Sequence, residues 1–359
     1  MRLIYVHLGK EMPIYLLKNL DRSIRLFPEI SLVVIVNNLN NMGVFPHPNI
    51  EYFFYQKTKN YYINEISSKL DSDFRKGFWI YSLMRLDAIV CYINESSPGP
   101  MIHSESDVIF MPNFPWNKMQ ELNQIAWTRY NNQLDSAALI YFPDKLKTDR
   151  FGHLLKDLLG QRSKATDMSI LSEISHSHVN SFKILPSLES VSSDLVNPFY
   201  PKLYNDIEKM QENFEQFEGL FDAAAFGMWL TGQDPRNNFG YTKIMANSNL
   251  KNGDSLIDPS RASYKISDQN LYIEVAGIQI PIWNLHIHSK NTKLFDRFWE
   301  SELKNFVDKS NLGKPYQKFE YKVFYKVLSD NRNQKTLIRF VLNLPCLTPI
   351  KNFLKKYLK

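Results

Sequence analysis

The sequence predicts an α/β fold in which helices cover both faces of a mostly parallel sheet. Short apolar runs alternate with segments of helical spacing through the first half of the chain. The run at 31–36 is apolar throughout, as is typical of a strand that is buried on both faces. With 359 residues and 44% hydrophobic content, the chain is also long and apolar enough to bury a large core.

The first half of the chain is expected to alternate between strands and helices. The strands are expected at 3–8, 31–36, 50–55, 100–111, 125–129 and 137–142, and the helices at 13–26, 62–70 and 77–94. Pro13 suits the first turn of its helix, since its missing N–H would have no partner there. Ligands of such sheets bind beyond the carboxyl ends of the strands. Gly9, Asn37 and the segment at 105–107 should therefore share one edge.

The second half is predicted to contain helices and loops before a closing hairpin. One helix is expected to start at Asp167 with an acidic cap, and another to occupy 218–232 and end at Gly232.

The polar stretch at 251–268 predicts a loop. Strands at 271–276 and 278–287 predict the hairpin, with Gly277 at its turn. Residues 313–359 are expected to form a basic, helical C-terminal extension.

The amino-acid composition indicates which binding partners and which cellular compartment to expect. The chain has 43 Lys and Arg against 37 Asp and Glu, a formal charge of +6, which favours anionic partners. Cys91 and Cys346 lie in apolar surroundings and form neither a disulfide framework nor a zinc spacing. The apolar run at the N-terminus is too short for a signal peptide, and no stretch of 18 apolar residues occurs. A cytoplasmic location is therefore expected.

The last nine residues, 351–359, form a short basic amphipathic pattern. One interpretation is a terminal helix with a solvated basic side. The other is docking on the inner face of a membrane, through the lysines together with Phe353, Leu354, Tyr357 and Leu358.

Two carboxylates one residue apart interrupt an apolar stretch at Glu105 and Asp107. On an extended backbone, residues i and i+2 project from the same face, so both carboxylates could point at one place. Two like charges held this close are costly unless a cation lies between them. Mg²⁺ or Mn²⁺ is the expected occupant, and the alternative is a solvated turn with two surface acids.

A second polar cluster closes the last apolar strand, where His286 and His288 share a strand face by the same spacing. Imidazole is a suitable ligand for Mn²⁺, and Lys290 lies just beyond, where it could contact a phosphate oxygen. The alternative is one buried and one surface histidine.

Together these segments resemble nucleotide-sugar-dependent glycosyltransferases of the GT-A fold, which is a Rossmann-like sheet flanked by helices. The resemblance covers roughly residues 1–300. It implies that Asp107, with Glu105, and a late histidine hold Mn²⁺ or Mg²⁺ against the diphosphate of the donor. His288 is preferred over His286 because it is nearer the end of the strand. Lys290 would bind phosphate.

The same resemblance implies further contacts to the nucleotide-sugar donor. It assigns them to His7 and Gly9 after the first strand, to Asn37 after the second, and to Arg85 on the helix before the acidic segment. It also implies a catalytic domain at 1–312, divided into a nucleotide-binding half at 1–145 and an acceptor half with the closing hairpin at 146–312.

The segment around Asp222 resembles bacterial transferases that build surface polysaccharides. By this resemblance Asp222, at the first turn of its helix, is the base that deprotonates the acceptor hydroxyl, and the reaction inverts the anomeric configuration. Asp167, also at a helix start, is the alternative base or a contact to the donor sugar. The acceptor would be a glycan or a lipid-linked sugar.

Two other functions remain open from the sequence. A sugar nucleotidyltransferase would share the sheet and the acids, although the chain has no early Gly-rich phosphate loop. A non-catalytic carbohydrate-binding protein would need no metal. Nucleic acid is not an expected partner, because the core carries no RNP-like strand, helix-turn-helix signal or stripe of Lys and Arg.

Overall fold

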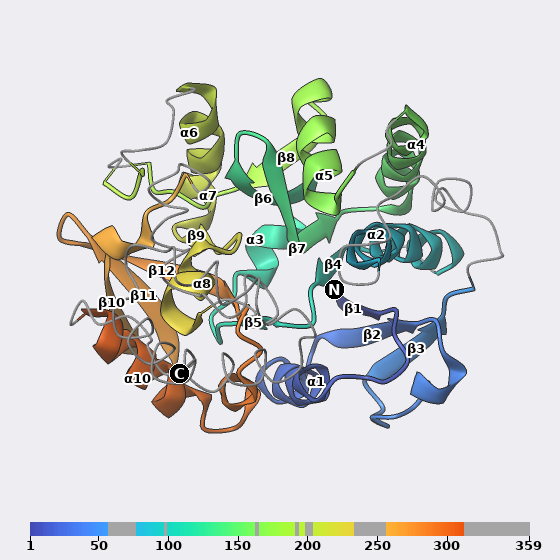
Figure 1. Ribbon diagram of the computed structural model, residues 1–359, viewed down its shortest axis with the longest axis horizontal. Helices are drawn as coiled ribbons and strands as arrows, with labels where there is room; N and C mark the ends of the chain where they lie inside the picture. Colours follow the sequence, from blue (N-terminus) through green and yellow to red (C-terminus); the bar gives the residue numbers. More distant parts are fainter. Residues whose placement is uncertain are drawn as a thin grey trace, which may run out of the picture.

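The computed structural model describes residues 1–56, 77–96, 99–161, 165–190, 194–197, 204–232 and 256–311 (Figure 1). Three predicted features lie outside these ranges: the helix at 62–70, the C-terminal extension at 313–359 with its basic tail, and the first part of the loop at 251–268.

The described chain forms two sheets with helices around them. The strands are β1 Arg2–His7, β2 Ser31–Val36, β3 Ile50–Phe54, β4 Met101–Ser104, β5 Val108–Phe110, β6 Ile125–Asn131, β7 Leu134–Phe142, β8 Phe182–Leu185, β9 Leu220–Phe221, β10 Ser263–Ser267, β11 Asn270–Val275 and β12 Ile278–His286. The α-helices are α1 Ile14–Leu26, α2 Phe78–Glu95, α3 Trp116–Gln120, α4 Lys145–Gln161, α5 Asp167–Ser177, α6 Tyr204–Gln211, α7 Phe214–Phe217, α8 Ala225–Thr231 and α10 Trp299–Asn311, with short 3₁₀ turns that include η6 Thr292–Phe295.

The first sheet has seven strands in the order β3-β2-β1-β4-β7-β6-β8. Strands β3, β2, β1 and β4 pair in parallel, as do β6 and β8, while β7 runs antiparallel to both of its neighbours. The predicted α/β fold with a mostly parallel sheet is therefore confirmed, and the predicted strands at 31–36 and 137–142 end where expected.

Alternate residues of β1 face two different layers, as the period of two requires. Ile4 packs with α2 and α5 in one hydrophobic core, whereas Leu3 and Tyr5 pack with α1 in another. Both faces of this strand are thus covered, which explains why the middle of β1 and all of β2 after Ser31 are apolar.

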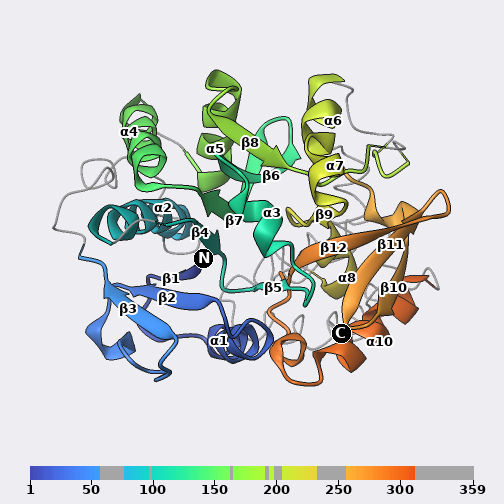
Figure 2. The same ribbon diagram turned by 180° about the vertical axis from the view of Figure 1, so that it is seen from behind.

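The second sheet has the order β10-β11-β12-β5, with β9 also paired to β12. Figure 1 shows β10, β11 and β12 on one side of the molecule and β1, β2 and β3 on the other, with α1 between them, and Figure 2 shows the same arrangement from behind. The predicted hairpin is confirmed as β11 and β12, joined at Gly277, whose φ of 80° is in the left-handed region that glycine tolerates.

Three sequence-based boundaries were wrong. The single strand expected at 100–111 is divided into β4 and β5, because residues 105–107 turn the chain from the first sheet into the second. The helix expected at 218–232 begins only at Ala225, since Leu220–Phe221 pairs with β12 as β9. The predicted loop at 251–268 contains β10, which pairs with β11.

Neither sheet is formed by one continuous half of the chain. Strand β5 precedes residue 145 but belongs to the second sheet, whereas β8 follows it and belongs to the first. The predicted division at 145/146 therefore does not separate the sheets. Among the described residues, no helix is long and apolar enough to cross a bilayer.

Candidate functional site

The candidate site is built around the turn that joins β4 to β5. This turn lies at the carboxyl end of β4, next to the end of β1, with which β4 pairs in parallel. The N–H of Glu105 donates to the carbonyl of Ala138, and the N–H of Val108 donates to the carbonyl of Glu105. The turn is thus held by the main chain, which leaves both of its carboxylates available to the site.

The register of the second sheet brings a late segment to this turn. Strands β12 and β5 pair antiparallel, with His286 opposite Val108. The N–H of Ile287 then donates to the carbonyl of Asp107 at 2.7 Å. About 180 residues of sequence separate the two segments, but the pairing places His286 beside both acids.

Glu105, Asp107 and His286 form a cluster of three candidate metal ligands. The Nε2 of His286 lies 3.0 Å from Oε2 of Glu105 and 3.2 Å from Oδ2 of Asp107. One ligand atom from each residue lies within 4.8 Å of the other two. The side chains of Asp107 and His286 are only 5% and 7% exposed, so water screens their charges poorly.

Two cations complete the cluster. Lys290 forms an ion pair with Oδ2 of Asp107, and Arg85 forms one with Glu105. Arg85 also pairs with Asp167, through NH2 and Oδ2 at 2.6 Å. Three carboxylates thus face two permanent cations. The formal charges of these five side chains sum to about −1, and further positive charge would be favourable there.

The pKa values of two of these acids shift in opposite directions. Burial raises the pKa of Glu105, but Arg85, His286 and Lys290 outweigh this effect and hold it well below its usual range. Burial also raises the pKa of Asp167, and Arg85 only partly opposes that rise. Of these two acids, Glu105 therefore stays ionised more readily.

The sequence analysis preferred His288 as the metal ligand, whereas the histidine in contact with the acids is His286. Strand β12 ends at His286, and His288 lies in the following turn, so the spacing of two no longer fixes its direction. The ring of His288 stacks on that of His286, with 3.9 Å between ring centroids. The structure therefore places the ring of His286 in contact with both carboxylates and the ring of His288 against that of His286.

Asp222 takes a different position from the one predicted. It precedes helix α8 instead of lying in its first turn, because residues 220–221 form β9. Its Oδ1 accepts hydrogen bonds from the N–H groups of Ala224 and Phe226, each at 3.0 Å, and its Oδ2 accepts from those of Gly227 at 2.8 Å and His286 at 3.0 Å. Both oxygens are thus occupied by backbone donors, and the residue is 1% exposed.

These bonds make Asp222 a link between the start of α8 and the end of β12. Asn284 strengthens the link, since its side chain accepts from the N–H of Asp222 and donates to its carbonyl. Burial raises the pKa of Asp222, while the backbone donors oppose the rise. The geometry indicates that this carboxylate positions His286.

Gly227 is a residue whose importance sequence reasoning missed. A Cβ at this position would lie 1.9 Å from the carbonyl oxygen of His286 and 2.8 Å from Oδ2 of Asp222. The start of α8 can approach β12 this closely only without a side chain. A glycine inside a predicted helix is a recognised signal of such close packing.

Asn19 on α1 was also missed. It is fully buried, and its side-chain amide donates to the carbonyls of Ser106 and Val108 at 3.2 and 2.7 Å. One side chain thus holds the acid turn against α1. The pattern of the amphipathic helix offered no reason to single it out.

Replacing Asn19 with aspartate should therefore destabilise the fold. The substitution keeps the shape of the side chain but places a carboxylate against two carbonyl oxygens, at an expected cost of about 2–4 kcal/mol. Urea unfolding measures the loss, and Asn19→Leu, which adds no buried charge, should cost less. Equal stability of Asn19→Asp and the unsubstituted protein would show that these hydrogen bonds do not hold the turn.

Three of the residues predicted to contact the nucleotide-sugar donor, His7, Gly9 and Asn37, lie at the carboxyl ends of β1 and β2. His7 ends β1, and its ring covers Gly9, where a Cβ would lie 2.8 Å from it. Burial lowers the pKa of His7. Asn37 follows β2, and its buried Oδ1 has no hydrogen-bond partner among the described residues.

The loop after β1 is held by asparagines that follow β2. Asn38 donates to the carbonyl of Lys10 at 2.9 Å, and Asn41 donates to that of Gly9 at 3.0 Å. Two loops at one edge of the sheet are thus fixed to each other, on the same edge as the acid turn.

The donor set fits a hard divalent cation. Two carboxylate oxygens and one imidazole nitrogen converge on one point, and this combination is common for Mn²⁺ and acceptable for Mg²⁺. Glu105, Asp107 and His286 would hold the ion. The excess negative charge of the cluster is consistent with this assignment.

No protein-family model and no curated protein matches this sequence. Similar solved structures include galactosyltransferase LgtC with donor and acceptor sugar analogs, at a TM-score of 0.36 and 11% identity over 48% of this chain and 70% of that one. An active-site mutant of LgtC gives 0.38 and 12%, over 52% and 73%. The apo form of glycosyltransferase GlyE of Streptococcus pneumoniae TIGR4 gives 0.33 and 10%, over 49% and 43%. All three TM-scores lie below 0.5, and we draw nothing about the reaction from them.

Proposed function

We propose that this protein is a metal-dependent glycosyltransferase. It would move a sugar from a nucleoside-diphosphate sugar to a hydroxyl of a glycan or lipid-linked acceptor. The observation that supports this best is the convergence of Glu105 and Asp107 with His286 and Lys290, at the sheet edge where α/β folds bind ligands. This is the combination of acids, late histidine and lysine that the resemblance to GT-A enzymes requires.

Different residues of the site would bind different parts of the nucleotide-sugar donor. A divalent ion held by Glu105, Asp107 and His286 would supply positive charge against the leaving diphosphate. Lys290 lies beside the same cluster and would add a second cationic contact to a phosphate oxygen. His7, Gly9 and Asn37 would meet the nucleoside at the ends of β1 and β2.

In the transfer step, the acceptor oxygen forms a bond to the anomeric carbon, and the bond from that carbon to the diphosphate breaks. The proton of the hydroxyl must go to a base. We assign that role to Asp167, because it shares Arg85 with Glu105 and its pKa is raised by burial. Asp222 is assigned to positioning, since four backbone N–H groups already occupy its oxygens. Direct displacement of this kind would invert the anomeric configuration.

Release of nucleoside diphosphate from a panel of nucleotide sugars, with and without Mn²⁺, tests the proposal. We expect Mn²⁺-dependent release from one donor, and an increase when a hydroxyl acceptor is added. We also expect the nucleoside diphosphate and Mn²⁺ together to raise the melting temperature more than either does alone.

Two results would contradict the proposal. Formation of nucleoside triphosphate from pyrophosphate and a nucleotide sugar would identify a nucleotidyltransferase. Absence of any stabilisation by nucleotides with Mn²⁺, across the whole panel, would exclude a donor site.

A further inference from the structure

A cavity lies among residues that take no part in the acid turn. Its volume is about 700 Å³, within the range of roughly 300–1,000 Å³ that is usual for small-molecule sites. Glu29 and Ile30 line it just before β2 begins, and residues 113–118 and 120 line it after β5 ends. It therefore opens at the amino ends of the parallel strands, whereas the candidate site follows their carboxyl ends.

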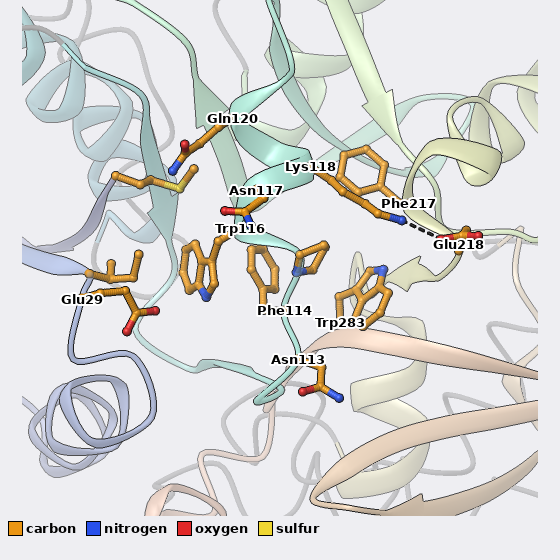
Figure 3. Close-up of a pocket in the computed structure, with 13 residues that line it drawn as sticks. Glu29, Asn113, Phe114, Trp116, Asn117, Lys118, Gln120, Phe217, Glu218 and Trp283 are labelled. Atoms are coloured by element: carbon orange, nitrogen blue, oxygen red, sulfur yellow. Dashed lines mark hydrogen bonds and ion pairs between the residues drawn. The ribbon is translucent and has the colours of Figure 1, made fainter.

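Aromatic rings form the floor of this cavity. Figure 3 shows Trp116, Phe114 and Trp283 in a row, with Glu29 at one end and Glu218 at the other. The rings of Phe114 and Trp116 are in contact, with their centroids 4.5 Å apart. Trp283 packs directly on Gly219, where a Cβ would lie 2.5 Å from the indole.

Both indoles in the floor have an unsatisfied donor. The Nε1 atoms of Trp116 and Trp283 are buried and have no acceptor among the described residues. A buried indole N–H normally has a hydrogen-bond partner, so each of these two calls for an explanation.

Amide side chains surround the rings. Asn113, Asn117 and Gln120 are exposed at the rim, and their side chains make no hydrogen bond to any described residue. Each amide presents two donors and one acceptor, the mixture that hydroxyl groups of a ligand require.

The charges at the rim give little support to an anionic ligand. Among the described residues that line the cavity, the charged side chains are Glu29, Lys118 and Glu218. Lys118 is already paired with Glu218 at 2.7 Å. Apart from this pair, the cationic group among the described lining residues is the N-terminal ammonium of Met1, so a neutral ligand with many hydroxyls is favoured over an anionic one.

We propose that this cavity binds a neutral oligosaccharide. The apolar faces of the sugar rings would lie on the half-buried indoles of Trp116 and Trp283, with the buried ring of Phe114 between them, and the hydroxyls would meet the amides at the rim. The proposal does not depend on the transfer reaction, because the two sites lie at opposite edges of the first sheet.

Binding of the full-length protein to an array of neutral and acidic oligosaccharides, two to six sugars long, tests this inference. The tightest neutral compound is then titrated by calorimetry against the protein and its variants. Asn117→Ala combined with Gln120→Ala removes two exposed amides, so this variant should fold normally and bind at least about tenfold more weakly. Asn123→Ala removes an exposed amide outside the cavity and should bind as the unsubstituted protein does.

Asp107→Ala distinguishes this cavity from the candidate active site, and it should leave oligosaccharide binding unchanged. The inference is overturned if no neutral oligosaccharide binds, if only acidic ones bind, or if the double variant retains full affinity. It is also overturned if Asp107→Ala abolishes binding, which would place the sugar at the acid turn. Failure of the transferase proposal would instead appear as absence of turnover of nucleotide sugars.

Discussion

Asp107→Ala should reduce turnover of the nucleotide sugar by at least about a thousandfold, equivalent to ~4 kcal/mol of transition-state stabilisation. The substitution removes the carboxylate that both His286 and Lys290 contact. The turn itself should survive, since its bond to the second sheet joins the main-chain carbonyl of Asp107 to the N–H of Ile287. Steady-state kinetics with saturating Mn²⁺ measures the loss, and thermal melting confirms that the fold is kept.

Asp21→Ala is the matched control, because it removes an acid whose side chain is 43% exposed and pairs with Arg25 on the surface of α1. It should leave turnover unchanged. In the same assay, His286→Ala should resemble Asp107→Ala, whereas His288→Ala should have a smaller effect. Full activity of Asp107→Ala would end the proposal of a metal-dependent reaction at this cluster.

Gly227→Ala should destabilise the protein by at least about 3 kcal/mol. The new methyl group would meet the carbonyl oxygen of His286 at 1.9 Å, and neither backbone can rotate away as a side chain could. Helix α8 would have to separate from β12. This separation would break the hydrogen bond from the N–H of Gly227 to the carboxylate of Asp222. Chemical denaturation measures the loss.

Gly160→Ala is a control that should change the stability of the protein in the opposite direction. Gly160 lies in α4, and a Cβ there would meet no atom within 4 Å. Alanine should therefore stabilise this helix by up to about 1 kcal/mol. If Gly227→Ala were as stable as the unsubstituted protein, helix α8 could not lie as close to β12 as described. The position of His286 would then be wrong as well.

Most of the first sheet and the acid pair could be predicted because local patterns determine them. Alternation of apolar runs with helical spacing identified the strands of the first sheet other than β8, and the apolar run at 31–36 marked β2 to the residue. Glu105 and Asp107 could be identified because two acids inside an apolar stretch need a structural or chemical reason.

The partners of these acids could not be predicted with the same certainty, because they depend on pairing between distant segments. The choice between His286 and His288 depends on where β12 ends, and the register with β5 determines that. Asp222 appeared to start a helix because its sequence favours one, yet pairing of β9 with β12 overrides that preference. Asn19 acts through main-chain carbonyls, which no side-chain pattern reveals.

The most direct test of the central claim is the anomalous scattering of Mn²⁺ in crystals of this protein. We predict one strong peak bound by Glu105, Asp107 and His286, which disappears in Asp107→Ala. A peak at another place, or no peak at a Mn²⁺ concentration that supports turnover, would contradict the account.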